Sequence, residues 1–363
     1  MIIDVIKHAN KLKATDIHIT EGKKIAFRID GEIVVMNEYI ETPRDVIVQF
    51  LDIAVPESLG NFVQPITEHS VNSIDFSFTE EKENIRVRCQ AFKDISGMSL
   101  AVRLLYGRIP SIRELNLPQS IERFTKMHDG LVIFTGATGS GKSTTLASIL
   151  DEINNERAVN ILTIEDPIEY VHKDKRARIF QREVGKHVGS FATATVEALR
   201  QDPDIIQVGE MRDLVTIENA LIMAETGHLV FGTMHALSVV DTIDRIVNVF
   251  PDNAQNQIRF SLSNVLRGVV SQKLVKSNKG GRVPICEIMM VDDVIANLIR
   301  KQHDKNSFRD TFRSNKALGS VHLVDNVIWH IQQGNLTLDY VKQYLSDNDY
   351  ELLVNNLGAR QIR

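Results

Sequence analysis

Residues 136–143 read GATGSGKS and match the phosphate-loop pattern G-x-x-x-x-G-K-[ST] at each fixed position. The apolar run Leu131–Thr135 before the loop is typical of a buried strand, and Thr144–Ile153 after it has apolar residues at helical spacing. Glycines let successive backbone N–H groups point at an anion, and a following helix adds its positive dipole end. The pattern therefore predicts binding of a nucleotide's phosphates. The expected nucleotide-binding residues are Gly136, Ala137, Thr138, Gly139, Ser140, Gly141, Lys142, Ser143 and Thr144.

Two residues of this loop have chemical roles of their own. Lys142 can reach the β- and γ-phosphates, so we expect it to act in catalysis as well as in binding. The hydroxyl of Ser143 can ligate Mg²⁺. The alternative is a glycine-rich turn that binds nothing, which the strand and helix on its two sides disfavour.

Carboxylates follow two further apolar runs. Glu165 and Asp166 end the run ILTIED, Glu169 comes one short turn later, and Glu210 ends DIIQVGE. Carboxylates beside a triphosphate repel it unless they hold Mg²⁺ or position water. We therefore predict that Glu210 orients or deprotonates the attacking water, and that Asp166 and Glu210 join Ser143 as metal ligands. The alternatives are a solvated acidic loop and a surface glutamate in a turn.

Histidines and arginines form a second group of candidates. His228 and His235 bracket a third apolar run, GHLVFGTMH. His235 would lie at the same sheet edge as Glu210, where a hydrogen bond could sense the γ-phosphate, although a lone histidine can equally be a core or surface residue. Arg88 and Arg103 lie on alternating strands, where most arginines form a solvated face; in a ring, however, one subunit can supply an arginine to its neighbour's phosphates.

The composition is that of an ordinary globular protein. The 363 residues have a formal charge of −5, so no general basicity favours nucleic acid, and no nucleic-acid partner is expected. No apolar run approaches the roughly 20 residues of a membrane span, and the first residues do not resemble a signal peptide. Cys89 and Cys286 are far apart and support neither a zinc site nor a disulfide framework. A cytoplasmic protein is expected.

The elements that must position these residues fall into two patterns, and residues 1–106 predict a small α+β domain. Helices are expected over 1–13 and 43–55. Alternating segments predict an antiparallel sheet, with Asp30 and Gly31 in a hairpin turn. The segment 107–118 has prolines towards both ends and is typical of a linker. The strands are expected within 14–20, 24–36, 71–78, 84–92 and 98–105.

Residues 119–291 alternate strands with helices, which predicts an α/β domain with a mostly parallel sheet covered on both faces. Ligands bind at the carboxyl ends of the strands in such sheets. Residues 292–363 are expected to form a helical region, with a polar connection over 306–319. The expected strands of the sheet are Leu131–Thr135, Val159–Glu165, Asp204–Gly209, Leu229–Thr233 and Val283–Met290.

Four segments give these motifs a family resemblance: GATGSGKSTT, TIEDPIEYVH, ALRQDPDIIQVGEMRD and ETGHLVFGTMH, accompanied by ATDIHI near the start. With them, the chain resembles the PilT-type twitching-motility ATPases of the type II/IV secretion ATPase superfamily from residue 14 to residue 300. Assembly and type II secretion ATPases carry a long extra N-terminal domain and a four-cysteine zinc insertion. This chain shows neither, and so it is similar to the short, retraction-type members of the superfamily.

The resemblance implies a PAS-like N-terminal domain, a RecA-like ATPase domain and a hexameric ring. It implies type IV pilus retraction by domain rotation, with ATP and Mg²⁺ as ligands. The ring would dock on a polytopic inner-membrane platform protein at the inner face of the cytoplasmic membrane and act indirectly on pilin. Carried over residue by residue, the implied site consists of Lys142 and Ser143 on phosphates and Mg²⁺, the catalytic Glu210, the acids Glu165, Asp166 and Glu169, the histidine-box pair His228 (a nucleotide contact) and His235, and the arginine fingers Arg88 and Arg103.

The chain departs from the family pattern at several positions. Ala137 stands where a proline is usual, and Ala236 stands where a threonine is usual after the second histidine. The AIRNLIRE segment of the retraction members reads VIANLIRK at Val294–Lys301, and the stretch expected before the last helices reads GSVHLV at Gly319–Val324. The nucleotide loop keeps its fixed positions, so the departures concern coupling to the pilus rather than binding.

Three alternative functions remain open at this point. A pilus assembly or type II secretion ATPase is disfavoured by the missing extension and zinc insertion. A RecA-like motor on nucleic acid is disfavoured by the net acidity and by the lack of a basic–aromatic stretch. A regulatory nucleotide-binding module with little turnover is disfavoured by the complete set of acids. The chain has no Asn-Lys-x-Asp guanine-recognition motif, which favours ATP over GTP.

Overall fold

The computed structural model describes residues 1–29, 31–55, 72–83, 85–105, 108–301, 305–314 and 318–361. Asp30 of the expected hairpin turn lies outside the described residues. The chain divides into two units, Met1–Arg108 and Ile109–Arg363. Within the described parts of the chain, no helix is long and apolar enough to cross a membrane.

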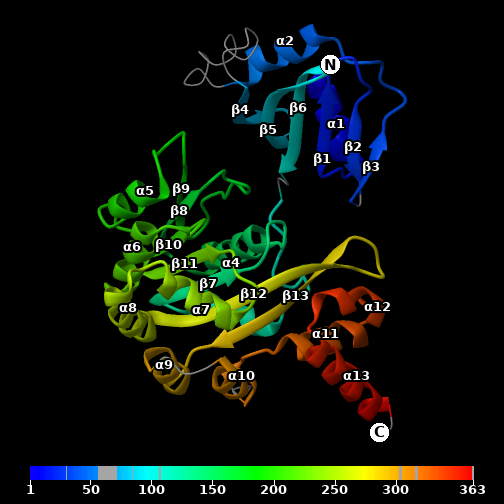
Figure 1. Ribbon diagram of the computed structural model, residues 1–363. Helices are drawn as coiled ribbons and strands as arrows, with labels where there is room; N and C mark the ends of the chain where they lie inside the picture. Colours follow the sequence, from blue (N-terminus) through cyan, green and yellow to red (C-terminus); the bar gives the residue numbers. More distant parts are fainter. Residues whose placement is uncertain are drawn as a thin grey trace. The chain divides into compact units, whose positions relative to one another are not determined.

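The first unit is an antiparallel sheet with strand order β3-β2-β1-β6-β5-β4 (Figure 1). Its helices α1 and α2 bury their apolar residues in the same cluster as one face of the sheet, because both sequences repeat apolar residues at helical spacing. The elements are α1 Ile2–Lys11, β1 Asp16–Thr20, β2 Ala26–Ile29, β3 Glu32–Val35, α2 Arg44–Ala54, β4 Ser73–Glu80, β5 Ile85–Asp94 and β6 Gly97–Leu105.

The second unit contains a seven-stranded sheet with the order β13-β12-β7-β11-β10-β8-β9. All neighbouring strands are parallel except β12 and β13, which pair antiparallel. The expected strand at 283–290 is therefore present but not parallel to the rest. The strands are β7 Gly130–Thr135, β8 Asn160–Glu165, β9 Arg178–Glu183, β10 Ile205–Val208, β11 Leu229–Met234, β12 Leu266–Lys276 and β13 Arg282–Met290.

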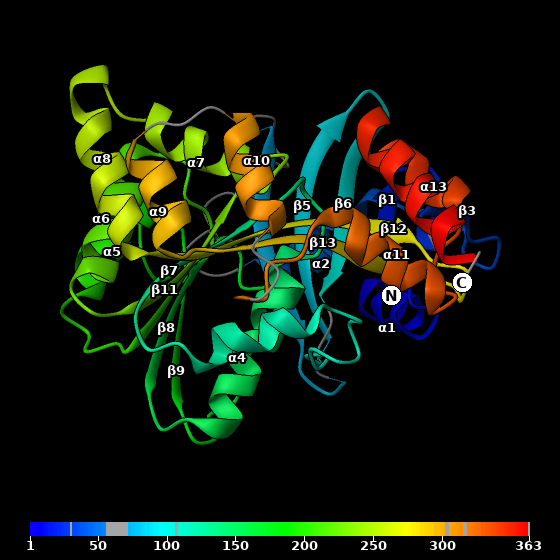
Figure 2. The same cartoon turned by 90° about the horizontal axis from the view of Figure 1, so that it is seen from below.

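Helices cover both faces of this sheet, and each face has its own hydrophobic cluster. Helix α4 and the 3₁₀ helix η2 pack on one face, while α5 to α9 pack on the other, and Figure 2 shows α4 on the side opposite α6, α8 and α9. Two central strands, β7 and β11, are buried along their whole length, as expected for parallel strands between helical layers. The helices are η2 Gln119–Lys126, α4 Lys142–Glu156, α5 Phe191–Ala198, α6 Leu214–Glu225, α7 Val239–Asn248, α8 Asp252–Val265 and α9 Asp293–Arg300.

The C-terminal helices belong to the second unit. Side chains of α11, α12 and α13 form a separate cluster with Val275, Val283 and Ile285 on β12 and β13. The polar connection expected over 306–319 is wrong for most of its length, because Lys305–Ser314 forms helix α10. Its only apolar residues, Phe308 and Phe312, are one helical turn apart, and both are buried. The remaining elements are α11 Leu323–Gln332, α12 Leu338–Val341, η4 Lys342–Tyr344 and α13 Asp347–Gln361.

Two strands were not expected from the sequence. Strand β12 begins at Leu266, directly after the last residue of α8, so no turn residues mark the change from helix to strand. Strand β9, with the sequence RIFQRE, is an edge strand of the sheet, and all but one of its residues are exposed or only partly buried. Its weak apolar pattern is typical of an edge and gave no clear strand signal.

His330 on α11 makes the stability of the second unit depend on pH. Its side chain is fully buried, and burial lowers the pKa of the ring to about 4. The unfolded chain binds the proton near pH 6.5 but the folded chain does not, so stability falls as the pH drops from 6.5 towards 4. We expect this one group to remove about 2 kcal/mol of unfolding free energy between pH 7 and pH 5.

Urea denaturation of the native chain and of His330→Gln at the two pH values measures this effect. The variant should lose about 2 kcal/mol less than the native chain between pH 7 and pH 5, whatever its absolute stability. Other titrating groups cancel in this difference. Equal losses in the two proteins would contradict the assignment.

Candidate functional site

The phosphate loop joins β7 to α4 with the geometry of an anion-binding turn. Gly136, Gly139 and Gly141 have φ values of +144°, +75° and +89°, which only glycine adopts without strain. Helix α4 begins at Lys142, directly after the loop, so its free N–H groups face the same side as the loop. The backbone predicted from the pattern is therefore present.

Lys142 folds back over this loop. Its Nζ donates to the carbonyl oxygens of Gly136 at 2.8 Å and of Ala137 at 3.1 Å. Burial lowers the pKa of the ammonium, while the charges of Glu169 and Glu210 raise it. The positive group is thus held in the loop with two carboxylates close enough to act on it. An ammonium held over the loop can contact the β- and γ-phosphates of a bound nucleotide.

The acids and His235 lie at the same sheet edge as the loop. Strands β7, β8, β10 and β11 are parallel and in register, so their carboxyl ends lie side by side. Glu165 ends β8, Glu210 follows β10, and His235 follows β11. Nε2 of His235 lies 3.9 Å from Oε1 of Glu210, and Nη1 of Arg212 lies 3.9 Å from Oε2 of Glu210. The structure therefore brings the predicted water-activating acid and the predicted phosphate sensor together.

Glu165 is the most buried of these carboxylates. Burial raises its pKa to about 7, against the opposing effect of hydrogen bonds from Thr163 and Gln181. Thr163 Oγ1 donates to Glu165 Oε1 at 2.6 Å, and Gln181 Nε2 donates to the same oxygen at 3.2 Å. A carboxyl with a pKa near neutrality can exchange a proton at working pH, whereas an ordinary glutamate remains ionised.

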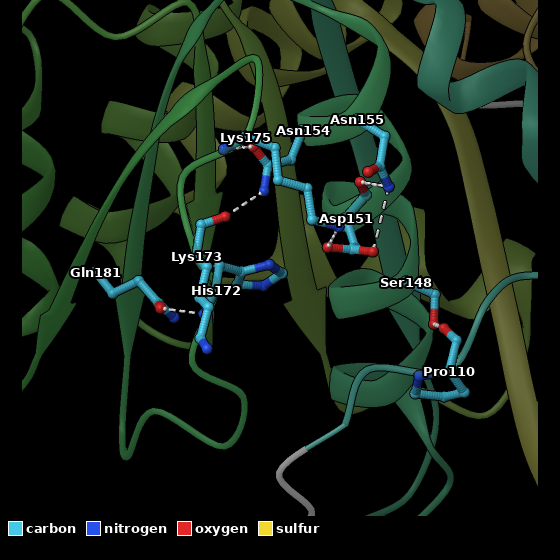
Figure 3. A network of polar contacts seen from close by, with 9 residues as sticks. All are labelled: Pro110, Ser148, Asp151, Asn154, Asn155, His172, Lys173, Lys175 and Gln181. Atoms are coloured by element: carbon cyan, nitrogen blue, oxygen red, sulfur yellow. Dashed lines mark hydrogen bonds and ion pairs between the residues drawn. The ribbon is translucent and has the colours of Figure 1, made fainter.

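Polar contacts hold the segment after Glu165 against α4. Gln181 Nε2 also donates to the carbonyl of Tyr170, and the hydroxyl of Tyr170 lies 3.0 Å from Thr144 Oγ1 in the first turn of α4. Figure 3 shows the next contacts along the chain, in which Gln181 accepts from the backbone N–H of His172. The acidic segment is thereby tied to the helix that begins at the phosphate loop.

Asn154 makes two further contacts of this kind. It is fully buried on α4, and its amide donates to the carbonyl of Lys173 and accepts from the N–H of Lys175 (Figure 3). We expect Asn154→Ala to lower the free energy of unfolding by about 2 kcal/mol, because a fully buried amide is removed and two partly buried backbone groups lose their partners. Asn155→Ala is the matched control, since Asn155 Nδ2 bonds only to Asp151 of its own helix.

Thermal and urea unfolding of the two asparagine variants measure this difference. The control should stay within about 0.5 kcal/mol of the native chain, as is usual for exposed positions. Equal effects of the two substitutions would show that Asn154 does not hold the segment.

His228 does not lie with the rest of the site. It precedes β11, and its carbonyl accepts from the N–H of Gly130, the first residue of β7. His228 and His235 are thus at opposite ends of one strand, about 20 Å apart for a strand of six residues. The ring of His228 contacts the carbonyl oxygen of Met223 and the hydroxyl of Thr226. His228 thus lies away from the phosphate loop of its own subunit, and its predicted contact with nucleotide stays a prediction.

Arg88 and Arg103 lie in the first unit, directly opposite each other on β5 and β6. Arg103 Nε donates to Asp16 Oδ1 at 2.9 Å, and Arg88 Nη2 lies 3.8 Å from Asp75 Oδ1. Both guanidinium groups are substantially exposed despite these partners. Their predicted role towards a neighbouring subunit's phosphates stays a prediction.

Several residues of the site had no signal in the sequence. Tyr170, Gln181 and Asn154 are single polar residues without a motif. Gln272 is buried on β12 and contacts the phosphate loop. Of these four residues, only Gln272 had a possible signal in the sequence, because it lies inside the largely apolar run LRGVVSQKLV.

This fold and this loop define a phosphate-loop nucleotide-binding protein of the α/β class. A family model described as "Type II/IV secretion system protein" matches residues 1–343, and the chain belongs to that family.

Relatives agree with this assignment. The type IV pilus retraction ATPase PilT of Pseudomonas aeruginosa is 42% identical over 300 residues, which cover 83% of this chain and 85% of the relative. A twitching motility protein of Neisseria gonorrhoeae is 44% identical over 254 residues, 68% of this chain and 67% of the relative. The crystal structure of the pilus retraction motor PilT with bound ADP has a TM-score of 0.84 at 40% identity and covers 95% of this chain and 97% of that one. The resemblance and the α/β fold class predicted from the sequence are confirmed.

Proposed function

We propose that this chain is an ATP-hydrolysing motor that powers type IV pilus retraction. The observation that carries the proposal is the convergence of Lys142, Glu210 and His235 at one sheet edge, in a chain with relatives named as retraction and twitching-motility proteins. The chain is an ATPase that converts ATP and water to ADP and phosphate. It is proposed to act in the cytoplasm, at the inner face of the cytoplasmic membrane.

Each residue of the site has a task in the proposed reaction. The loop N–H groups bind the phosphates, and Lys142 exchanges its carbonyl partners for the β- and γ-phosphate oxygens. The carboxylate of Glu210 orients the attacking water and accepts its proton. His235, 3.9 Å from that carboxylate, donates a hydrogen bond to the γ-phosphate and so reports its presence. Negative charge developing on the leaving phosphate is stabilised by Lys142.

The oxygen ligands at this edge fit Mg²⁺. This ion prefers one or two carboxylates together with hydroxyl, water and phosphate oxygens. Ser143 stands beside Lys142 at the start of α4, while Asp166 and Glu210 follow neighbouring strands β8 and β10. No group of three His, Cys, Asp or Glu side chains among the described residues could hold a metal ion by itself. When bound, Mg²⁺ would neutralise charge between the β- and γ-phosphates.

The motor is proposed to be a homohexamer. Its sites would lie at subunit boundaries, with Arg88 or Arg103 supplied to the neighbour's phosphates after leaving its own aspartate partner. Rotation of the first unit against the second during hydrolysis would then do mechanical work on the inner-membrane platform protein of the pilus machine, and through it on pilin. The altered segment Val294–Lys301 begins at the second residue of α9 and ends one residue after the helix.

Counting surface pili in the native host tests this proposal. A strain without the protein and a strain carrying only Glu210→Gln are compared with the native strain for pili per cell and for surface motility. Excess pili and lost motility in both strains are expected for a retraction motor driven by hydrolysis. Complementation with Glu218→Gln, an exposed glutamate on α6, should restore the native state.

Other outcomes identify the alternatives. Cells without pili would mean that the motor assembles pili and does not retract them. Native pili and motility in both strains would contradict the proposal and favour an accessory role or a regulatory nucleotide-binding module. Salt-dependent binding of the purified protein to single-stranded DNA would favour the nucleic-acid motor.

A further inference from the structure

A buried glutamine on β12 contacts the phosphate loop through both ends of its amide. The side chain of Gln272 is 1% exposed. Its Nε2 donates to the carbonyl of Ser140 at 2.9 Å, and its Oε1 accepts from Thr145 Oγ1 at 2.9 Å. Ser140 belongs to the loop, and Thr145 lies in the first turn of α4. One side chain from a neighbouring strand therefore bridges the loop and its helix.

The loop is also shaped around this residue. A Cβ added to Gly136 would meet the backbone oxygen of Gln272 more closely than real Cβ atoms ever approach a neighbour. A Cβ added to Gly141 would lie 2.8 Å from Gln272 Nε2. Strand β12 pairs in parallel with β7, from which the loop departs, so both partners of this contact are fixed by the sheet. The first and last glycines of the loop are thus needed for close approach as well as for positive φ.

The contact to Ser140 sets the direction of a backbone N–H group. In a trans peptide the C=O and the following N–H point in opposite directions. Because the carbonyl of Ser140 points at Gln272, the N–H of Gly141 points away from it, towards the side where a phosphate in the loop would lie. The amide of Gln272 donates one buried hydrogen bond and accepts another. A flipped amide would lose both of them, so the side chain is held in one orientation.

We propose that Gln272 is a positioning residue for nucleotide binding. It fixes the peptide between Ser140 and Gly141 and holds Thr145, so that the loop N–H groups are aimed before the nucleotide arrives. This inference rests on the proposed function in one respect, namely that the loop is the nucleotide site. Gln272 touches no phosphate itself and acts only through the loop.

Nucleotide affinity and steady-state ATP hydrolysis of Gln272→Leu test the inference. We expect the Kd for ADP and the KM for ATP to rise about tenfold, which corresponds to about 1.4 kcal/mol. The kcat should change less than the KM, because a misaimed loop weakens ground-state and transition-state binding together. Thr145→Val removes one of the two hydrogen bonds and keeps the shape, so it should produce a smaller effect in the same direction.

Asn326→Leu is the matched structural control. Asn326 is a buried amide on α11 whose Oδ1 accepts from the N–H of Cys286 at 2.7 Å; Cys286 stands opposite Gln272 on β13, and this bond joins α11 to the sheet rather than to the loop. Its loss should lower the melting temperature without changing the Kd for ADP. The double variant of Gln272→Leu with Thr145→Val should show less than the sum of the two single effects on Kd, since both remove the same contact.

The outcomes separate this inference from the proposed function. Native protein that fails to bind ADP would overturn the nucleotide site and this inference with it. Native protein that binds ADP, with Kd and KM unchanged in Gln272→Leu, would overturn the positioning role alone. If Gln272→Leu does not fold, Thr145→Val decides, and an unchanged Kd for ADP in that variant contradicts the proposal.

Discussion

Replacing Glu210 by glutamine should lower the kcat for ATP hydrolysis about a thousandfold, within the range for loss of a general base. Glutamine has nearly the same shape but cannot accept the proton of the attacking water. The neighbours of Glu210 are both potential cations, Arg212 and His235, each 3.9 Å from one of its oxygens.

ADP affinity distinguishes a chemical effect of Glu210→Gln from a structural one. Binding of ADP should be retained within about threefold, because the phosphate-binding groups are the loop N–H groups and Lys142, and a loss of only the reaction step leaves ground-state binding in place. Stopped-flow hydrolysis and titration with a fluorescent ADP analogue measure the two quantities. Glu218→Gln on α6 is the control and should match the native chain in both. If Glu210→Gln lost ADP binding as well as turnover, Glu210 would act in nucleotide binding.

The phosphate loop could be predicted because all of its determinants are contiguous. Strand, glycines, lysine and helix follow one another within Leu131–Ile153, and each has a local signature. The acids could be predicted nearly as well, since a carboxylate after a buried parallel strand must emerge at the same edge as the loop. The same argument explains why His228 lies away from the loop of its own subunit. A motif with a histidine at each end of one strand sends the two side chains to opposite edges of the sheet.

The supporting contacts could not be predicted because they join residues far apart in sequence. Gln272 and Ser140 are separated by 132 positions, and Gln181 and Glu165 by 16 positions in two different strands. No local preference of glutamine points to either partner. Likewise, α10 is held by two buried phenylalanines in an otherwise polar segment, so tertiary packing outweighs its weak helical pattern. What the sequence lacked was the pairing of β12 with β7, which places Gln272 beside the loop.

Replacing Lys142 by methionine should strongly reduce ATP hydrolysis and the stabilisation by ADP without weakening the fold. Two charge-assisted hydrogen bonds to phosphate oxygens are worth about 3 to 6 kcal/mol together, so we expect hydrolysis to fall between about a hundredfold and ten-thousandfold. In the nucleotide-free chain, however, burial lowers the pKa of this ammonium, which means that the folded protein carries a cost for its charge. Methionine keeps the aliphatic stem and removes that cost.

Thermal unfolding with and without ADP separates these two effects. Native protein should be stabilised by about 2.7 kcal/mol at an ADP concentration of 100 times Kd, and Lys142→Met should lose most of that gain while its melting temperature without ADP stays equal or rises. Lys273→Met is the matched control. Burial also lowers the pKa of Lys273, whose Nζ donates to the carbonyl of Tyr344 at 2.8 Å. Because side chains alternate along β12, Lys273 points away from the face that carries Gln272, and its variant should keep the full response to ADP. A normal response of Lys142→Met to ADP would contradict the assignment of this lysine as the phosphate ligand.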